Sequence, residues 1–184
     1  MEIERKFVID LDIFDFDKYY KRDNPDAIKS KLYISQYYIP ALDGTFRLRR
    51  TCKDDHSFSF VIALKKFVEK GKNEEIEVHI DSNTAYEMIN GIKELKYLRK
   101  VRYKVEINSK IWDIDFFENG MCLGEIELDD INEEFEKPRF VKEEVTGDYR
   151  FSNEAIAKDL APPKLELADI SKSIWSEYGK KSKV

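Results

Sequence analysis

The stretch "EIERKF" at residues 2–7 alternates charged and apolar side chains. Successive side chains of a β-strand point to opposite faces of a sheet, so this period of two predicts a strand. Glu2, Glu4 and Lys6 then share one face, and the apolar residues share the other. Glu and Lys are poor strand formers, and two carboxylates on one face repel each other. The pattern therefore predicts a compensating partner for the charged face.

The same alternation recurs along the chain and predicts eight strands in all. Beyond the opener they are expected at 32–39, 46–50, 59–65, 74–80, 99–107, 111–118 and 122–129, the first with less clear facing. The dipeptides Asp43-Gly44 and Asn119-Gly120 favour tight hairpin turns, and "EKGKN" at 69–73 supplies another break. Such short connections join antiparallel neighbours, so the fold class is mainly β and antiparallel.

Few helices are predicted between these strands. Residues 82–96 have a helical pattern, and Ser152 is placed to cap a short helix that runs to about residue 160. Pro162-Pro163 then breaks the chain, and a final amphipathic helix is expected near 165–178. A short aromatic-rich helix is expected near 14–21. We predict one domain over 1–160 and a helical tail over 161–184.

The overall charge narrows the classes of function. The chain has 184 residues, of which 42% are hydrophobic, enough for a globular core. Its 32 basic and 37 acidic residues give a net charge of −5. General nucleic-acid or membrane-surface binding favours a net basic domain, so neither is expected. A local basic cluster that binds an anion remains compatible with this balance.

The cysteines and the apolar runs indicate a cytoplasmic protein. Cys52 and Cys122 lie far apart and form no Cys-x-x-Cys pair, which speaks against a disulfide framework or a zinc site. The charged N-terminus does not resemble a signal peptide, and no apolar run approaches membrane-spanning length. We therefore expect no membrane association.

The charged strand faces have two interpretations. Solvent on one side of an antiparallel sheet would explain them simply. However, the apolar faces are large and aromatic, and acids and cations segregate by strand. Eight strands can close into a barrel that holds a small ligand. Inward-facing cations would bind a polyanion such as a phosphate chain, and the carboxylates would require divalent metal ions between them and the phosphates.

At this point the sequence resembles the CYTH superfamily, the triphosphate tunnel metalloenzymes. The opener "EIERK" matches the superfamily's Glu-x-Glu-x-Lys motif. The later motifs follow in the superfamily's order: "RLR" at 47–49, "LK" at 64–65, Glu-x-Glu at 75–77, "KVR" at 100–102, Asp115, Glu-x-Glu at 125–127 and "VTGDYRFSNEAIA" at 145–157. The resemblance covers roughly residues 1–160. It implies an eight-stranded antiparallel closed β-barrel, the triphosphate tunnel, with a few peripheral helices.

The resemblance also implies roles for single residues. Glu2 and Glu4 would hold one divalent metal, Mg²⁺ or Mn²⁺, and Asp115, Glu125 and Glu127 a second. The phosphates would be bound by Lys6, Arg47, Arg49, Lys65, Lys100, Arg102 and Arg150. Among these residues, Glu4, Lys6, Lys65 and Arg102 are the predicted catalytic set. Glu75 and Glu77 would orient the cations or assist a metal. Phe151 departs from the tyrosine of many relatives.

The implied function is metal-dependent hydrolysis of a small-molecule triphosphate, most simply inorganic triphosphate. Phosphoryl transfer is largely positioning and charge neutralisation, and no Ser, Cys or His nucleophile is apparent. Three alternatives stay open: a class IV adenylate cyclase that converts ATP to cyclic AMP, a thiamine triphosphatase, and a module that binds polyphosphate or nucleotide without turnover. A homodimer is a further expectation.

Overall fold

The computed structural model describes residues 2–12, 15–16, 18, 20, 23–39, 41, 44–93 and 95–159. Its strands are β1 Glu2–Ile9, β2 Ile28–Ile39, β3 Thr45–Lys53, β4 Phe58–Glu69, β5 Lys72–Ile80, β6 Lys96–Ile107, β7 Lys110–Phe117, β8 Cys122–Glu127 and β9 Val141–Glu144. The helices are α1 Ser82–Gly91 and α2 Asn153–Ala157, and two 3₁₀ turns are η2 Pro25–Ala27 and η3 Tyr149–Phe151.

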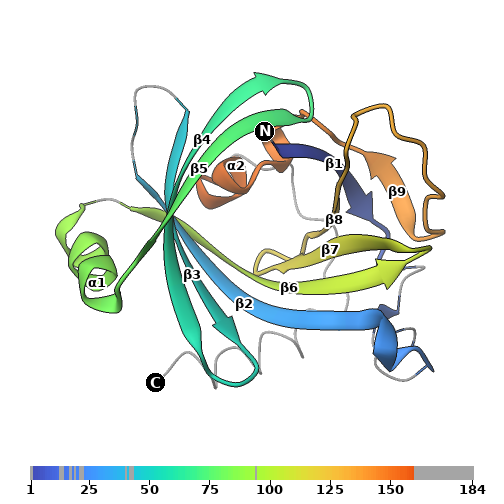
Figure 1. Cartoon of the computed structure of the whole chain (residues 1–184), viewed down its shortest axis with the longest axis horizontal. Helices are drawn as coiled ribbons and strands as arrows, with labels where there is room; N and C mark the ends of the chain where they lie inside the picture. The colour runs from blue at the N-terminus through green and yellow to red at the C-terminus, as the bar shows by residue number, and fades with distance from the viewer. Residues whose placement is uncertain are drawn as a thin grey trace.

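Eight of these strands close into an antiparallel barrel (Figure 1). The hydrogen-bonded order is β5-β4-β3-β2-β6-β7-β8-β1, and β1 pairs back with β5 to complete the ring. β9 adds a ninth strand beside the second half of β1. The eight-stranded closed barrel predicted from the sequence is therefore confirmed, with one extra strand.

The ring closes where the β4–β5 hairpin meets β1. Glu2 lies opposite Asn73 in the ladder, and the backbone N–H of Glu4 donates to the carbonyl of Gly71 at 2.9 Å. Gly71 has φ +74°, and a Cβ there would stand 2.9 Å from the Glu4 carbonyl oxygen. Only a glycine therefore allows this turn to approach β1 so closely. The break predicted at 69–73 is the point of barrel closure.

The outer face of the barrel carries the apolar core. Val101, Trp112 and Ile114 on β6 and β7 are buried there, against Phe16 from the segment after β1 and Phe140 from the loop before β9. A second cluster forms where α1 packs Ala85 on Leu48 and Phe60 of β3 and β4. The large apolar strand faces thus point outward and are covered by other segments, which leaves the charged faces to point inward.

The helices differ in detail from the sequence predictions. α1 ends at Gly91 rather than near 96, and its N-cap is Asp81, whose side chain accepts a hydrogen bond from the Thr84 N–H. Ser152 caps α2 as predicted, accepting from the Ala155 N–H. The helix predicted near 14–21 lies partly outside the described residues, and the one near 165–178 lies wholly outside them. None of the described helices is long and apolar enough to cross a membrane.

Candidate active site

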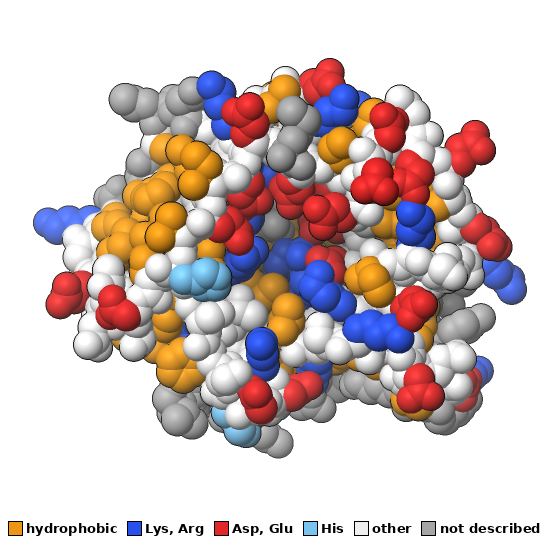
Figure 2. Space-filling view, in the orientation of Figure 1, with side chains coloured by type: hydrophobic (Ala, Val, Ile, Leu, Met, Phe, Trp, Pro, Cys, Tyr) orange, Lys and Arg blue, Asp and Glu red, His pale blue; other side chains and the backbone are white. Residues whose placement is uncertain are grey.

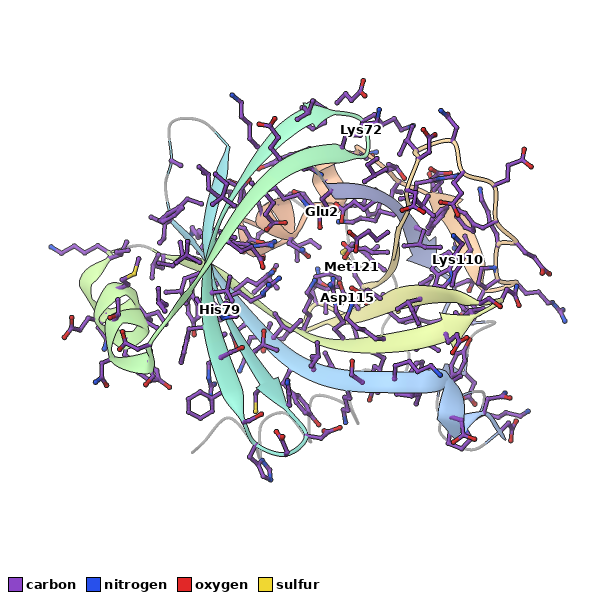
Figure 3. The ribbon with its side chains drawn as sticks, in the orientation of Figure 1. Glu2, Lys72, His79, Lys110, Asp115 and Met121 are labelled. Atoms are coloured by element: carbon purple, nitrogen blue, oxygen red, sulfur yellow. The ribbon has the colours of Figure 1, made fainter. Side chains whose placement is uncertain are left out.

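The barrel encloses a cavity of about 1270 Å³. All eight ring strands contribute lining residues, and the cavity wall is rich in charge. Figure 2 shows acidic and basic side chains meeting around a central hollow, and Figure 3 shows Glu2 and Asp115 inside the ring of strands. The alternation that places apolar side chains outside therefore places the charged ones around this cavity.

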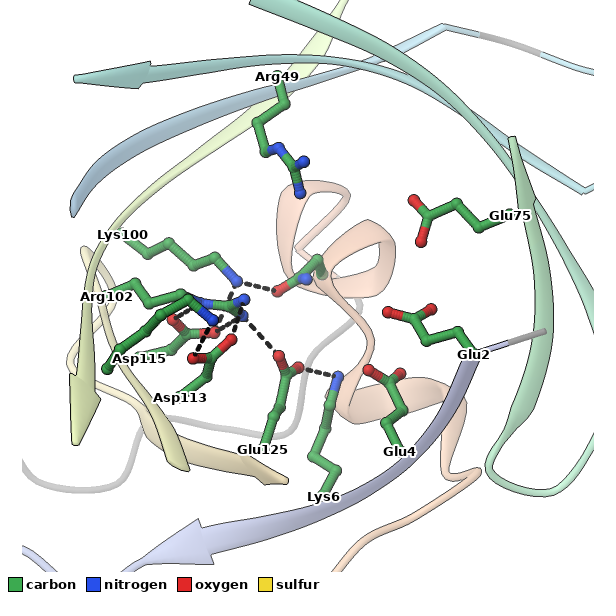
Figure 4. Close-up of polar contacts among 12 residues, drawn as sticks. Glu2, Glu4, Lys6, Arg49, Glu75, Lys100, Arg102, Asp113, Asp115 and Glu125 are labelled. Carbon is green, nitrogen blue, oxygen red and sulfur yellow. Dashed lines mark hydrogen bonds and ion pairs between the residues drawn. The ribbon is translucent and has the colours of Figure 1, made fainter. Parts of the chain in front are cut away.

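One side of the cavity is a buried network of ion pairs, which we call the buried network: Lys6, Lys100, Arg102, Asp113, Asp115 and Glu125 (Figure 4). The Asp115 carboxylate accepts hydrogen bonds from Lys100 Nζ at 2.6 Å and from Arg102 Nε at 2.7 Å. Arg102 also binds Asp113 at 2.6 Å and Glu125 at 2.5 Å. Lys6 Nζ completes the network at 2.8 Å from Glu125. These residues lie on β1, β6, β7 and β8. The antiparallel pairing of these strands places Lys6 opposite Glu125 and Arg102 opposite Asp115.

Burial makes this network strongly coupled. The side chains of Lys100 and Asp115 are 1% and 0% exposed. Burial opposes the charge of Arg102, but Asp115 and Glu125 outweigh it and hold the arginine pKa well above its usual value. Likewise burial is outweighed at Glu125, whose pKa Lys6 and Arg102 hold well below its usual range. Lys100 differs: burial and the adjacent Arg102 lower its pKa to about 8.

The neighbouring side of the cavity, formed by β1, β4 and β5, carries an excess of carboxylates. Glu2, Glu4 and Glu75, with their shared cation Lys65, form what we call the acidic cluster. Lys65 Nζ lies 2.7 Å from Glu2 and 3.2 Å from Glu4. Burial opposes the charge of Glu2, but the adjacent Lys65 outweighs it and lowers the pKa of this carboxyl. Burial raises the pKa of Glu75; Arg47 opposes this shift and the Glu2 carboxylate adds to it.

Two arginines on β3 connect the sides of the cavity. Arg47 binds Glu75 at 2.5 Å and Arg49 binds Glu77 at 2.8 Å. The Nε–H of Arg47 is buried and has no hydrogen-bond partner among the described residues. Burial and the neighbouring Arg47 lower the pKa of Arg49. These forks are placed to bind the oxygens of an anion in the cavity.

The donor set of the acidic cluster fits a hard divalent cation. Mg²⁺ and Mn²⁺ prefer carboxylate oxygens together with phosphate and water. Glu4 lies directly opposite Glu127 across the β1–β8 ladder, and Glu127 forms no ion pair with any described residue. Like charges placed opposite each other destabilise a sheet unless a cation intervenes. Within the described ranges no three acidic, His or Cys side chains already converge on a single point, so the carboxylates would rearrange around a bound ion.

The segment after β9 adds polar groups that the sequence did not predict as site residues. Asn153 Oδ1 accepts from Lys100 Nζ at 3.4 Å, and the Phe151 carbonyl accepts from Lys6 Nζ at 3.4 Å. Glu154 lines the cavity and accepts a hydrogen bond from the Thr45 hydroxyl at 2.8 Å. Figure 1 shows α2 across one opening of the ring. The motif at 145–157 is thus the place where the chain contacts the cavity again.

The structure places most of the predicted site residues around this one cavity. Those that line it are Glu2, Glu4, Lys6, Arg47, Arg49, Lys65, Glu75, Glu77, Lys100, Arg102, Glu125 and Glu127. Asp115 points inward but is fully buried beneath Lys100 and Arg102, where it holds two cations. Arg150 does not line the cavity: its side chain is 65% exposed and pairs with Asp148 at 2.5 Å. The catalytic, metal-binding and phosphate-binding roles themselves stay predictions.

Other cavity residues were missed by the pattern of charges. Gln36 and Tyr38 on β2 face the cavity, and the Tyr38 hydroxyl donates to Gln36 Oε1 at 3.2 Å. Burial raises the pKa of Tyr38, so this phenol stays protonated. Asp113 also lines the cavity as part of the buried network. Uncharged residues in a strand with unclear facing gave no signal, whereas the parity of Asp113 with Asp115 was visible in the sequence.

The fold and the cavity together define a class of protein. It is a closed antiparallel β-barrel whose interior combines lysines and arginines suited to binding phosphate with clustered carboxylates. Comparisons agree with this class. The chain is 30% identical to an inorganic triphosphatase of Acetivibrio thermocellus over 161 residues, which covers 86% of this chain and 94% of that protein. The chain belongs to this family of inorganic triphosphatases, within the triphosphate tunnel (CYTH) superfamily, whose members generally depend on metal ions.

Solved structures show the same fold. The crystal structure of the inorganic triphosphatase NE1496 matches with a TM-score of 0.55 and 26% identity, covering 89% of this chain and 97% of that one. The PH1012 protein from Pyrococcus horikoshii OT3 matches with a TM-score of 0.51 at 18% identity, covering 87% of each chain, and shares the fold. No protein-family model matches the chain.

Proposed function

We propose that this protein hydrolyses inorganic triphosphate inside the barrel, with Mg²⁺ or Mn²⁺ as cofactor and two ions per site. The observation that carries the proposal is that eight lysines and arginines from five strands line one cavity together with the carboxylates of the acidic cluster. A short linear polyanion requires only cations and metals for binding, and the cavity supplies both kinds of group. Family membership gives this interpretation its substrate.

The arginines and lysines would bind and orient the substrate. Arg47 and Arg49 present planar forks from β3, and Lys65 and Lys6 reach the cavity from β4 and β1. Arg forks match pairs of phosphate oxygens, whereas a lysine ammonium acts as a point charge. Holding the phosphate chain in line with an attacking water lowers the barrier, because most of the catalysis of phosphoryl transfer is positioning and charge neutralisation.

The buried network would keep these cations in place before substrate arrives. Asp115 fixes Lys100 and Arg102 from behind, and Glu125 fixes Arg102 and Lys6. Preorganised charges need no rearrangement when negative charge develops on the substrate. We assign Asp115 to this supporting position, while metal binding by Asp115 stays a prediction of the family resemblance.

The carboxylates of Glu2 and Glu4 would hold a divalent ion, with Glu125 and Glu127 on the facing strand as the second set. Such an ion supplies charge neutralisation for the phosphates and a water of lowered pKa. Glu75 lies against Glu2 and Arg47, so it would orient both groups. Lys65, which pairs with Glu2 and Glu4 in this structure, would turn toward the phosphates once a metal balances those carboxylates.

Product analysis tests the proposal. Tripolyphosphate, ATP and thiamine triphosphate would each be incubated with Mg²⁺ and then Mn²⁺, beside the Glu4→Gln variant. Phosphate release fastest from tripolyphosphate and lost in the variant supports the proposal. Cyclic AMP formed from ATP would identify a cyclase instead, and preference for thiamine triphosphate a thiamine triphosphatase. Tight binding of tripolyphosphate without any product would identify a binding module.

A readout that does not depend on turnover tests the metal. Mg²⁺ that binds only the folded state stabilises it and so raises the midpoint of thermal unfolding. The stabilisation is about 2.7 kcal/mol when the free Mg²⁺ concentration is 100 times the dissociation constant. We expect this shift in the wild type and a smaller one in Glu2→Gln. An equal shift in both proteins would remove Glu2 from the metal site.

We also propose a cytoplasmic location and a homodimeric assembly. The two cysteines, Cys52 and Cys122, are free thiols, which fits a reducing compartment. Fractionation of cells would test the location, and sedimentation at several protein concentrations would test the assembly.

A further inference from the structure

The strand β1 changes one of its neighbours along its length. On one side it pairs with β8 from Glu4 to Val8. On the other side its ladder with β5 ends at Ile3, and its ladder with β9 begins at Phe7. Between these two ladders, no described strand residue is paired with Lys6 on that side. The gap therefore falls at a member of the predicted catalytic set.

The segment after β9 fills this gap with a side chain. The backbone N–H of Lys6 donates to the Thr146 hydroxyl oxygen at 3.0 Å. The Val145 N–H donates to the Lys6 carbonyl at 2.8 Å. The hydroxyl thus takes the place that a strand carbonyl would have in an unbroken ladder. Without it the N–H of Lys6 would lose its acceptor in a part-buried position, which is costly for a backbone group.

A second hydrogen bond fixes the orientation of the Thr146 hydroxyl. A hydroxyl has one hydrogen to donate, and Thr146 donates it to Glu144 Oε1 at 2.9 Å. Glu144 is held in turn by Arg5, whose Nε lies 2.9 Å from the same oxygen. The lone pairs of the hydroxyl are therefore left to accept from Lys6. Thr146 is only 7% exposed, so little water can compete for these bonds.

The methyl group of Thr146 has a separate contact. It lies beside Gly71 in the turn between β4 and β5, because a Cβ added to that glycine would stand 3.1 Å from Thr146 Cγ2. The side chain therefore contacts the turn where the barrel closes as well as the backbone of β1. Its two groups can be removed separately, since serine keeps the hydroxyl and valine keeps the methyl.

The position of the Lys6 backbone determines where the Lys6 amine lies. The Nζ atom is 2.8 Å from Glu125 and 3.4 Å from the Phe151 carbonyl, and the side chain is 12% exposed. An amine held by a carboxylate and a carbonyl has little freedom to compensate for a displaced backbone. A misplacement of about 1 Å in a catalytic site can cost roughly 100-fold in rate. A residue that fixes the Lys6 backbone can therefore act on catalysis through the lysine.

We propose that Thr146 is a positioning residue, whose hydroxyl fixes the backbone of Lys6 and so the place of the Lys6 amine in the cavity. The effect of this role on hydrolysis rests on the proposed function, because it requires Lys6 to contact the triphosphate. The hydroxyl is the group that matters, so Thr146→Ser retains the role and Thr146→Val loses it.

Steady-state kinetics with tripolyphosphate test the effect on activity. Thr146→Val is expected to lower kcat/KM about 10-fold or more, and Thr146→Ser by less than about threefold. Thr84→Val is the matched control, because it removes a hydroxyl that donates to Asp81 at 2.6 Å outside the cavity. It is expected to leave kcat/KM unchanged. Equal losses in the serine and valine variants of Thr146 would assign the effect to packing and overturn the proposal.

A double-mutant cycle shows whether Thr146 acts through Lys6. The affinity for tripolyphosphate without metal is measured by calorimetry in the wild type, Thr146→Val, Lys6→Ala and the double variant. If the threonine acts through the lysine, the valine change weakens binding in the wild type but alters it by less than about twofold once Lys6 is removed. A purely structural role would weaken binding equally in both backgrounds, and that result would overturn the proposal.

Hydrogen exchange of the Lys6 amide tests the contact without any substrate. We expect exchange about 10-fold faster or more in Thr146→Val than in the wild type or Thr146→Ser, because only the valine variant removes the acceptor of this N–H. Equal exchange in the three proteins would overturn the proposal. The same readout separates it from the proposed function. A wild type that releases no phosphate while this contrast is intact would reject the hydrolysis and leave the fixed place of Lys6 standing.

Discussion

The two sides of the cavity use the same residue types in opposite ways. In the buried network, Lys100 and Asp115 are almost completely excluded from solvent, and every described charge has a close partner. In the acidic cluster, Glu2 and Glu4 keep 30% and 21% of their side-chain surface exposed and share one lysine, Lys65. The charges of the buried network balance within the protein, whereas the acidic cluster has more carboxylates than cations.

This difference separates a structural task from a chemical one. Charges removed from water are held only if each finds a partner, so breaking the buried network leaves a costly unpaired ion. Carboxylates that are partly exposed are still hydrated, so they can exchange a lysine for a metal ion at small cost. We therefore expect variants of the buried network to lose stability and variants of the acidic cluster to lose activity.

The largest effect is expected for Asp115→Ala. It leaves Lys100 and Arg102 in a buried site without the carboxylate that both contact. Removal of one partner from a buried pair costs about 3–5 kcal/mol. Urea unfolding monitored by circular dichroism measures this loss, with Glu127→Ala as the exposed matched control. A loss below about 1 kcal/mol would show that the network is not what stabilises the barrel.

Glu4→Gln is expected to have the reverse profile. The amide keeps the shape of the side chain and removes the charge needed to hold a cation, so the rate of tripolyphosphate hydrolysis should fall about 100-fold or more. Its free energy of unfolding should change by less than about 1 kcal/mol, because the pair with Lys65 is partly exposed. Glu118→Gln serves as the control, because Glu118 is an exposed carboxylate that pairs with Arg99 and does not line the cavity. A variant that hydrolyses at the wild-type rate would place the metal elsewhere.

The contrast between the two sides also explains what the sequence could predict. Alternation predicted the strands, because an inward charged face and an outward apolar face are both visible as a period of two. The register was not visible, since it depends on the stagger at closure, where β1 pairs with both β5 and β8. That stagger is what places Glu4 opposite Glu127 and buries Asp115 beneath Arg102. The sequence pattern shows which residues are charged, but it does not show which of these side chains are buried and which are in contact with solvent.

The segment 145–157 shows a second limit. The family resemblance brought it to the site, and the contacts of Asn153 and Glu154 with the cavity agree with that placement. Their roles were not predicted, because a short capped helix gives no facing pattern. Arg150 was predicted as a phosphate ligand, but Asp148 accepts from its backbone N–H and its guanidinium, and so turns the side chain outward.

A pair outside the cavity provides a reference of intermediate size. Arg5 on β1 binds Glu144 on β9 at 2.5 Å, and this hydrogen bond lowers the pKa of Glu144 from 4.5 to about 2. Because the folded protein favours the carboxylate, its stabilisation is present above pH 4.5 and is lost as the pH falls toward 2. Glu144 is 28% exposed, so solvent screening reduces the contribution to about 1 kcal/mol.

Glu144→Gln should therefore lower the free energy of unfolding by about 1 kcal/mol at pH 7 and by almost nothing at pH 2. Urea midpoints measured across this range, beside the unmodified chain, give the comparison. Equal losses at both pH values would mean that Glu144 acts by packing rather than by its charge.

The smallest effect is expected for Arg150→Ala. This variant tests whether an arginine outside the cavity contributes to activity. The arginine is 65% exposed, and its partner Asp148 is a neighbour in sequence, so an exposed pair of this kind contributes little to stability. It does not line the cavity, and we expect kcat/KM for tripolyphosphate to fall less than about threefold, against a loss of about 100-fold or more for Arg102→Ala. Measuring both variants at several ionic strengths separates direct contact from long-range attraction, because salt screens only the latter strongly. A loss in Arg150→Ala as large as that in Arg102→Ala would mean that the side chain leaves Asp148 and enters the tunnel with the substrate. The cation set of the site would then include a residue that the free protein holds outside.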